Sequence, residues 1–200
     1  MTEPSDDLLG QRADAVRNRA RLLEAAAWLV AERGAEHVTM HEVAQVAGVG
    51  KGTLFRRFGD RNGLLLALLD DVEAEFYDAY TFGPPPLGPG TAAAERLTAF
   101  GWALIERVAD ATDLGPALGR QVPSDRRQTS HYGRAFRHHV ASLLREAGVV
   151  GDHALLAHAL LAFVDLETLD HLRADDQVTT ARLKSTWADL VRRVTGAEEG

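Results

Sequence analysis

The stretch VAQVAGVGKGTLFRRF, from Val43 to Phe58, decides how the rest of the chain is interpreted. The apolar residues of its first half recur on one helical face. Gly48 follows where that helix should end, because glycine adopts the left-handed conformation without a Cβ penalty. After the turn, Leu54 and Phe58 lie four residues apart and point toward a core. The pattern predicts a helix, a tight turn and a second, short helix.

The outer face of that second helix is small, basic and hydroxyl-bearing. A DNA major groove admits a helix of this kind, so the pattern indicates a helix-turn-helix whose recognition helix runs from Lys51 to Arg57. On spacing alone an alternative stays open, since alanine-rich helical hairpins with solvated basic faces occur in many proteins. The outward-facing residues are Lys51, Gly52, Thr53, Phe55, Arg56 and Arg57.

The region from about Asn18 to Leu69 resembles the DNA-binding domain of the TetR family of bacterial transcriptional regulators. Four features carry the resemblance. They are Thr39 at the start of the second helix, an A-x-x-A-G-V turn at 44–49, K-G-T-L at 51–54 and an aromatic-x-x-Phe ending at 55–58.

Two departures from the family pattern affect the expected DNA contacts. The family usually has Tyr at position 55, whose hydroxyl touches a phosphate, so Phe55 would pack on a sugar or a thymine methyl instead. Gly50 stands where Ser is common and gives the recognition helix a weaker cap. The resemblance implies backbone contacts by Thr39, Phe55, Arg56, Arg57 and Arg61, and base-edge contacts by Lys51, Gly52 and Thr53.

Charge is unevenly distributed along the 200 residues, whose net charge is −7. Residues 10–63 hold nine basic and six acidic side chains, a net +3, whereas the remainder holds 13 and 23, a net −10. This asymmetry predicts a locally basic surface on an acidic body. There is no cysteine, so neither a disulfide framework nor a thiolate zinc site is expected. With no apolar run of about 18 residues and no signal core, we expect a cytoplasmic protein that does not contact membranes.

Apolar residues recur at helical spacing along nearly the whole chain, so we expect an all-α protein of about nine helices. A three-helix helix-turn-helix domain should cover residues 15–62, with its first helix at about 16–33. A ligand-binding and dimerisation domain should cover residues 63–196, and a helix from about 61 to 80 bridges the two. The segment FGPPPLGPG at 82–90 contains four prolines and three glycines and should be a surface loop. Single helices are expected at 124–147, 152–173 and 179–194.

The expected helix at 152–173 is apolar on almost every side up to Leu169. Such a helix must be buried on more than one side, and pairing with a second copy achieves this. The resemblance implies a homodimer held by a four-helix bundle of the last two helices of each copy. A dimer would also read the two half-sites of a palindromic operator in double-stranded DNA. The candidate interface residues are Leu156, Leu160, Leu183, Trp187, Leu190 and Val191.

Six of the eight histidines lie in the C-terminal domain, but their spacing does not favour a metal site. His138 and His139 are adjacent and face about 100° apart on a helix. No phosphate-binding loop or nucleophile elbow is present, and Asp165 and Glu167 do not share a face of one continuous helix. We therefore expect no metal, no cofactor and no enzymatic activity.

The resemblance also implies a small-molecule pocket among the middle helices, although ordinary core packing is the favoured explanation for any single candidate. The favoured interpretation is a homodimeric DNA-binding repressor released by an unknown effector. A ligand-independent regulator, an activator and a histidine-dependent helical metalloenzyme are the alternatives. The candidate pocket residues are Trp102, Ile105, Tyr132, Phe136, His139 and Phe163.

Overall fold

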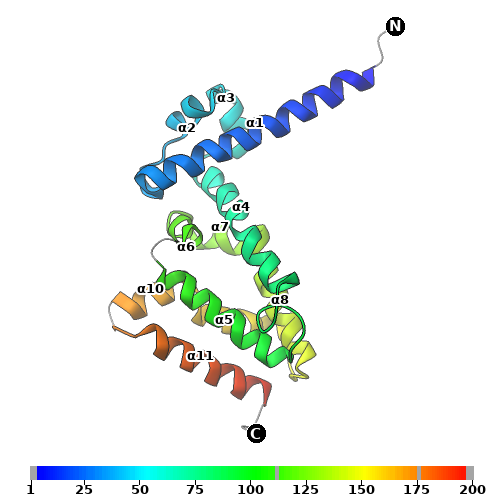
Figure 1. Cartoon of the computed structure of the whole chain (residues 1–200), viewed down its shortest axis with the longest axis vertical. Helices are drawn as coiled ribbons and strands as arrows, with labels where there is room; N and C mark the ends of the chain where they lie inside the picture. The colour runs from blue at the N-terminus through cyan, green and yellow to red at the C-terminus, as the bar shows by residue number, and fades with distance from the viewer. Residues whose placement is uncertain (1–3, 111–112, 175–176, 197–200) are drawn as a thin grey trace. The chain divides into compact units, whose positions relative to one another are not determined.

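The computed structural model describes residues 4–110, 113–174 and 177–196 (Figure 1). These residues form eleven α-helices and one short 3-10 helix, with no strand among them. The all-α fold class is thereby confirmed. The chain divides into two compact units, Met1–Leu68 and Leu69–Gly200, and the division falls inside α4.

The first unit consists of α1 (Pro4–Arg33), η1 (Ala35–His37), α2 (Met40–Ala47), α3 (Lys51–Phe58) and the beginning of α4 (Arg61–Phe82). The expectation that the first helix begins near residue 16 is wrong, because α1 begins at Pro4. A proline suits the first position of a helix, where its missing N–H removes no helical hydrogen bond. The core of this unit is formed by fully buried side chains, among them Leu22, Leu29, Val43, Leu54, Leu64 and Leu65.

The second unit continues α4 and adds seven helices. The proline-rich segment between α4 and α5 contains no helix, as the sequence predicts. The helices are α5 (Ala93–Ala109), α6 (Leu114–Gly119), α7 (Ser124–Thr129), α8 (His131–Glu146), α9 (His153–Phe163), α10 (Leu166–Ala174) and α11 (Thr180–Thr195).

Two expected helices are each divided in the structure, which raises the count from nine to eleven. The helix expected at 124–147 breaks at Ser130, whose hydroxyl accepts a hydrogen bond from the Gly133 N–H at 3.0 Å and caps α8. The helix expected at 152–173 breaks after Val164. There Asp165 accepts a hydrogen bond from the Glu167 N–H at 3.3 Å through Oδ2, at the start of α10. Short polar side chains compete with the helical hydrogen-bond ladder in this way.

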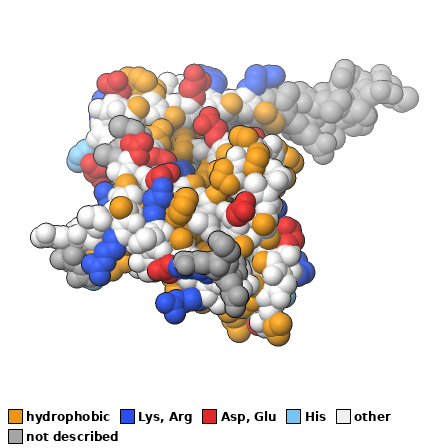
Figure 2. Space-filling view, turned by 60° about the horizontal axis from the view of Figure 1, so that its bottom comes forward, with side chains coloured by type: hydrophobic (Ala, Val, Ile, Leu, Met, Phe, Trp, Pro, Cys, Tyr) orange, Lys and Arg blue, Asp and Glu red, His pale blue; other side chains and the backbone are white. Residues whose placement is uncertain are grey.

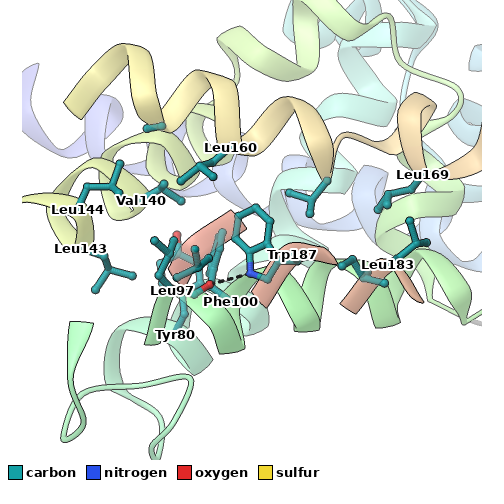
Figure 3. Packing of buried hydrophobic residues seen from close by; sticks show 14 of the residues in the cluster. Tyr80, Leu97, Phe100, Val140, Leu143, Leu144, Leu160, Leu169, Leu183 and Trp187 are labelled. Carbon is teal, nitrogen blue, oxygen red and sulfur yellow. Dashed lines mark hydrogen bonds between the residues drawn. The ribbon is translucent and has the colours of Figure 1, made fainter. Parts of the chain in front are cut away.

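The core of the second unit is organised around Trp187 on α11, which packs against α5. The indole is fully buried. Figure 3 shows its N–H aimed at a backbone carbonyl of α5, and it donates to Leu97 and Thr98 at 3.1 Å each. Gly101 makes this close packing feasible, since a Cβ atom there would lie 1.9 Å from Cε2 of the indole.

The molecular surface carries both signs of charge. Figure 2 shows one face on which basic, acidic and hydrophobic side chains are interspersed. None of the helices in residues 4–110, 113–174 and 177–196 is both long enough and apolar enough to cross a membrane.

Candidate functional site

Helix α3 presents the outer face that the sequence predicts. Its inward residue Leu54 is fully buried in the first unit. Lys51, Gly52, Arg56 and Arg57 are exposed, and Phe55 keeps 49% of its surface in contact with solvent. The remaining candidate on this helix, Thr53, is half-buried. A large exposed aromatic side chain, followed in the sequence by two exposed arginines, is available to contact another molecule.

The turn before α3 has the expected glycines at both ends. Gly48 ends α2 in the left-handed conformation, with φ 61°. Gly50 precedes α3 with extended backbone angles and provides no side-chain hydrogen bond to the helix. The weak cap inferred from the sequence is therefore present in the structure.

Thr39 caps α2 and forms a hydrogen-bonded group with two charged residues. Its Oγ1 accepts a hydrogen bond from the Glu42 N–H at 3.3 Å and donates to the Glu42 carboxylate at 2.7 Å. Arg33 donates to the same carboxylate at 2.9 Å. The Thr39 hydroxyl, followed by Arg33, lowers the pKa of Glu42. The hydroxyl proton is committed to Glu42, so Thr39 must rotate before it can donate to a phosphate.

Arg61 occupies a different environment from the other candidate DNA contacts. Its Nε donates to the Val38 carbonyl at 2.8 Å, and its Nη2 donates to the Ala35 carbonyl at 2.6 Å. These carbonyls belong to the segment that leads into Thr39. We therefore assign Arg61 a positioning role, in which it fixes the start of α2 against the start of α4.

Replacing Arg61 with methionine is expected to lower the free energy of unfolding by about 1–3 kcal/mol, because two carbonyls lose their donors. Urea unfolding measures this loss. Arg57→Met is the matched control, since Arg57 is exposed and its removal should change unfolding by less than about 0.5 kcal/mol. For DNA binding we expect the opposite, namely a larger effect of Arg57→Met than of Arg61→Met. Arg57→Met should reduce the slope of log K for DNA binding against log salt by about 0.9. Unchanged unfolding with a reduced salt slope for Arg61→Met would instead identify Arg61 as a phosphate contact.

A groove of about 870 Å³ lies beside α3 in the first unit. Its walls come from α1, α3 and the start of α4. Arg19 from α1 lines it together with Arg56 and Arg57 from α3. The middle of the long helix α1 thus contributes positive charge to the same surface as α3.

A model for a family described as bacterial regulatory proteins, tetR family, matches residues 22–68. These residues include α2, α3 and the elements that position them. Residues 22–68 are thus similar to the DNA-binding domain of the TetR family.

Curated relatives match a short part of the chain. An HTH-type transcriptional regulator of Staphylococcus aureus is 43% identical over 53 residues, which are 26% of this chain and 29% of that protein. The chain therefore matches less than a third of the relative's length.

Solved structures resemble the chain in fold over most of its length. RolR in complex with its ligand resorcinol aligns with a TM-score of 0.68 at 20% identity, covering 94% of this chain and 98% of that one. A TetR transcriptional regulator from Rhodococcus sp. RHA1 aligns with a TM-score of 0.60 at 20% identity, covering 94% and 99%. At these identities the likeness concerns the fold alone.

The second unit contains a cavity of about 410 Å³ lined by helices α4 to α10. Tyr132 and Phe136, two of the six residues expected at a pocket, line it. Ile105 is fully buried in the core. Phe163 stacks on Trp187 with ring centroids 6.4 Å apart.

The other two expected pocket residues also have different surroundings. Trp102 lies at the surface, where its N–H donates to the Lys184 carbonyl at 2.9 Å. His139 packs in an aromatic cluster, with its ring centroid 4.4 Å from that of Tyr80. Burial, followed by the charges of Arg96 and His138, lowers the pKa of His139 to about 4.

A buried ionic network lies beside this cavity, and the sequence did not predict it. Arg107 on α5 donates to both carboxylate oxygens of Glu73 on α4, at 2.7 and 3.0 Å. It also donates to both oxygens of Asp113, at 2.7 and 3.1 Å, while Asp113 caps α6 by accepting from the Gly115 N–H. Glu73 retains 7% of its accessible surface. One guanidinium thus connects three helices.

The residues expected at a dimer interface are largely used within their own chain. Leu160, Leu183, Trp187 and Val191 are buried in the core of the second unit. Leu156 and Leu190 are half-buried and pack against the same core. The exposed side of α9 is nevertheless apolar, because it consists mainly of Ala154, Leu155, Ala159 and Ala162.

Proposed function

We propose that this chain is a homodimeric, sequence-specific DNA-binding transcriptional regulator that acts in the cytoplasm as a repressor and is released from its operator by a small-molecule effector. The exposed face of α3 carries this proposal. Lys51, Arg56 and Arg57 are exposed there on a domain that matches the tetR family model.

The contacts follow from the positions of these side chains on α3. Lys51, Gly52 and Thr53 occupy its first turn, so they approach base edges when this end enters the major groove. Arg56 and Arg57 occupy the last turn and face phosphates on either side. Thr39 joins them at the N-terminus of α2, a position that favours an anion, after its hydroxyl leaves Glu42.

The exposed apolar side of α9 supports dimer formation. Leu155 keeps 66% of its surface exposed, and three alanines continue this side of the helix. Small side chains allow a second helix to approach closely, and the buried apolar area stabilises the contact. We propose that the partner's α9 covers this surface and that the pair presents two recognition helices to a palindromic operator.

The cavity in the second unit supports an effector. Its volume of about 410 Å³ lies in the range typical of small-molecule sites. An effector releases the operator only if it binds the conformation that does not fit DNA more tightly than the one that does. RolR, whose fold this chain resembles, is described in complex with resorcinol, and we propose a small organic ligand here as well.

Selection from randomised DNA duplexes tests DNA binding and dimeric recognition together. The purified chain is mixed with the duplexes and excess competitor at about 150 mM salt, a concentration at which nonspecific binding is weak. Enrichment of an inverted repeat with half-sites about one helical turn apart is the expected result. Enrichment of a single half-site would reject the dimer, and no enrichment from folded protein would reject sequence-specific binding.

Replacing Lys51 with alanine is expected to relax the base preference at one position of each half-site. A side chain that contacts base edges contributes about 1–3 kcal/mol of discrimination against the wrong base. The selection is repeated with this variant, and Arg57→Ala is the control because a phosphate contact affects all sequences alike. A uniform loss of affinity for Lys51→Ala, with unchanged preference, contradicts its base-reading role.

A further inference from the structure

Two of the arginines that line the cavity, Arg107 and Arg127, are already neutralised by carboxylates of the protein. Arg107 shares four hydrogen bonds with Glu73 and Asp113. Arg127 donates through Nη2 to both oxygens of Glu167 at 2.5 Å, and through Nη1 to two backbone carbonyls. Neither guanidinium is available to a ligand anion unless these bonds break.

Asp165 is the carboxylate that lacks such a partner. It lines the cavity at the break between α9 and α10 and is half-buried. Its Oδ2 accepts a hydrogen bond from the Glu167 N–H at 3.3 Å. Within the described ranges no Lys, Arg or His forms an ion pair with it, and its carboxylate neighbour Glu167 is held by Arg127. A half-buried carboxylate beside another carboxylate is destabilised in its charged form.

The remainder of the cavity wall is apolar and aromatic. Leu104 and Val108 from α5 and Leu161 from α9 contribute aliphatic surface, while Tyr132 and Phe136 from α8 contribute two rings. The faces of aromatic rings attract cations. The wall therefore combines hydrophobic surface, two rings and one carboxylate that forms no direct ion pair, although Arg127 lies near enough for its charge to act on it.

We propose that the cavity binds a lipophilic organic cation, with its positive charge against Asp165 and its apolar groups against Tyr132, Phe136 and the aliphatic wall. This inference deepens the effector site of the proposed function and rests on it for its regulatory meaning. The net charge of the surroundings agrees with it. The cavity is lined by three carboxylates and three guanidiniums, and two further carboxylates, Asp113 and Glu167, are bonded to those guanidiniums.

Arg137 on α8 is the lining cation that this arrangement does not neutralise, and it defines the competing class of ligand. A lipophilic anion would use Arg137 in place of Asp165. The two classes are separated by a pair of ions with the same shape and opposite charge, tetraphenylphosphonium and tetraphenylborate.

Titration calorimetry of both ions into the full-length chain, without DNA, tests the proposal. The phosphonium is expected to bind at least about tenfold more tightly than the borate, because burial strengthens charge pairing. Asp165→Asn keeps the shape of the side chain and should remove this preference. Glu106→Gln, which removes one negative charge from an exposed position outside the cavity, should leave it unchanged. Tighter binding of the borate, or an unaltered preference in Asp165→Asn, overturns the proposal.

The pH dependence of phosphonium binding provides a second readout. Burial, followed by the neighbouring Glu167, raises the pKa of Asp165 to about 6. Protonation removes the charge that the cation requires, so affinity should fall as the pH is lowered from 7.5 to 5, and Asp165→Asn should show no such fall. Glu167 on α10 and Arg127 on α7 act directly on Asp165. The other charged and titratable groups that line the cavity are Tyr132 and Arg137 on α8, His158 on α9, Asp70 and Glu73 on α4, and Arg107 on α5. A fall that persists in Asp165→Asn assigns the titration to another of these groups and contradicts the proposal.

Failure of this inference is distinguishable from failure of the proposed function. If the chain selects an operator but the phosphonium does not bind in preference to the borate, the cavity assignment is rejected and DNA recognition stands. If the phosphonium binds through Asp165 and no operator is selected, the cavity assignment stands and the regulatory function is rejected.

Discussion

Replacing Arg107 with methionine is expected to lower the free energy of unfolding by about 3–5 kcal/mol, the cost of removing one member of a buried ionic group. The variant leaves Glu73 and Asp113 close together without their common cation. Burial alone would lower the pKa of Arg107, but the hydrogen bonds that it donates to Asp113 and Glu73 raise its pKa above the ordinary value. The guanidinium is therefore always charged, and the loss should be seen at every pH at which the two carboxylates are ionised.

Arg120→Met is the matched control for this prediction. Arg120 also forms two hydrogen bonds to one carboxylate, that of Asp170, at 2.8 Å each. Both side chains are more than one-third exposed, and pairs of this kind contribute about 0–1 kcal/mol. Urea unfolding of the two variants compares the loss of a buried arginine–carboxylate interaction with the loss of an exposed one. Equal losses would show that burial does not determine the contribution of the Arg107 network.

Gly101→Ala is expected to destabilise the second unit by about 3 kcal/mol, at the upper end of typical overpacking costs. The added methyl group would lie 1.9 Å from Cε2 of Trp187. The indole cannot move away freely, because its N–H is bonded to two carbonyls of α5. Either the Trp187 side chain leaves its position or α5 and α11 separate. Thermal or urea unfolding measures the loss of stability.

Two further variants make this prediction specific. At Gly52 an added Cβ has no atom within 4 Å, so Gly52→Ala should stabilise α3 by up to about 1 kcal/mol through helix propensity. Trp187→Phe introduces a smaller ring, and combining it with Gly101→Ala should cost less than the sum of the two single changes. Additive losses would mean that the two residues do not interact.

The sequence predicted those parts of the fold that depend on local patterns. The end of α2 at Gly48, the basic outer face of α3 and the non-helical segment after α4 each follow from neighbouring residues. The breaks at Ser130 and Asp165 were missed, because hydrophobic spacing continues through both. Each break depends on one short polar side chain that accepts a backbone N–H, a choice that competes closely with helix continuation.

The same distinction applies to the candidate sites. Arg61 was expected to face DNA from its position after α3, but its acceptors, the carbonyls of Val38 and Ala35, lie 23 and 26 residues earlier. Asp165 and Glu167 were set aside because residues two apart do not share a face of one helix, yet the break brings them together. Tyr132 and Phe136 reach the cavity, whereas Ile105 on another helix faces the core. Only the packing of distant segments distinguishes these cases.

The uncapped start of α3 has a consequence for the thermodynamics of DNA recognition. Gly50 offers no side-chain acceptor, and within the described ranges the N–H groups of Lys51 and Gly52 have no backbone acceptor. An oxygen atom of DNA that accepts from these groups would act as the missing cap of an eight-residue helix. Part of the free energy of binding then appears as ordering of the recognition helix. Its amide hydrogens should exchange rapidly in the free protein and slowly in the complex, so the helix would complete its folding on the operator.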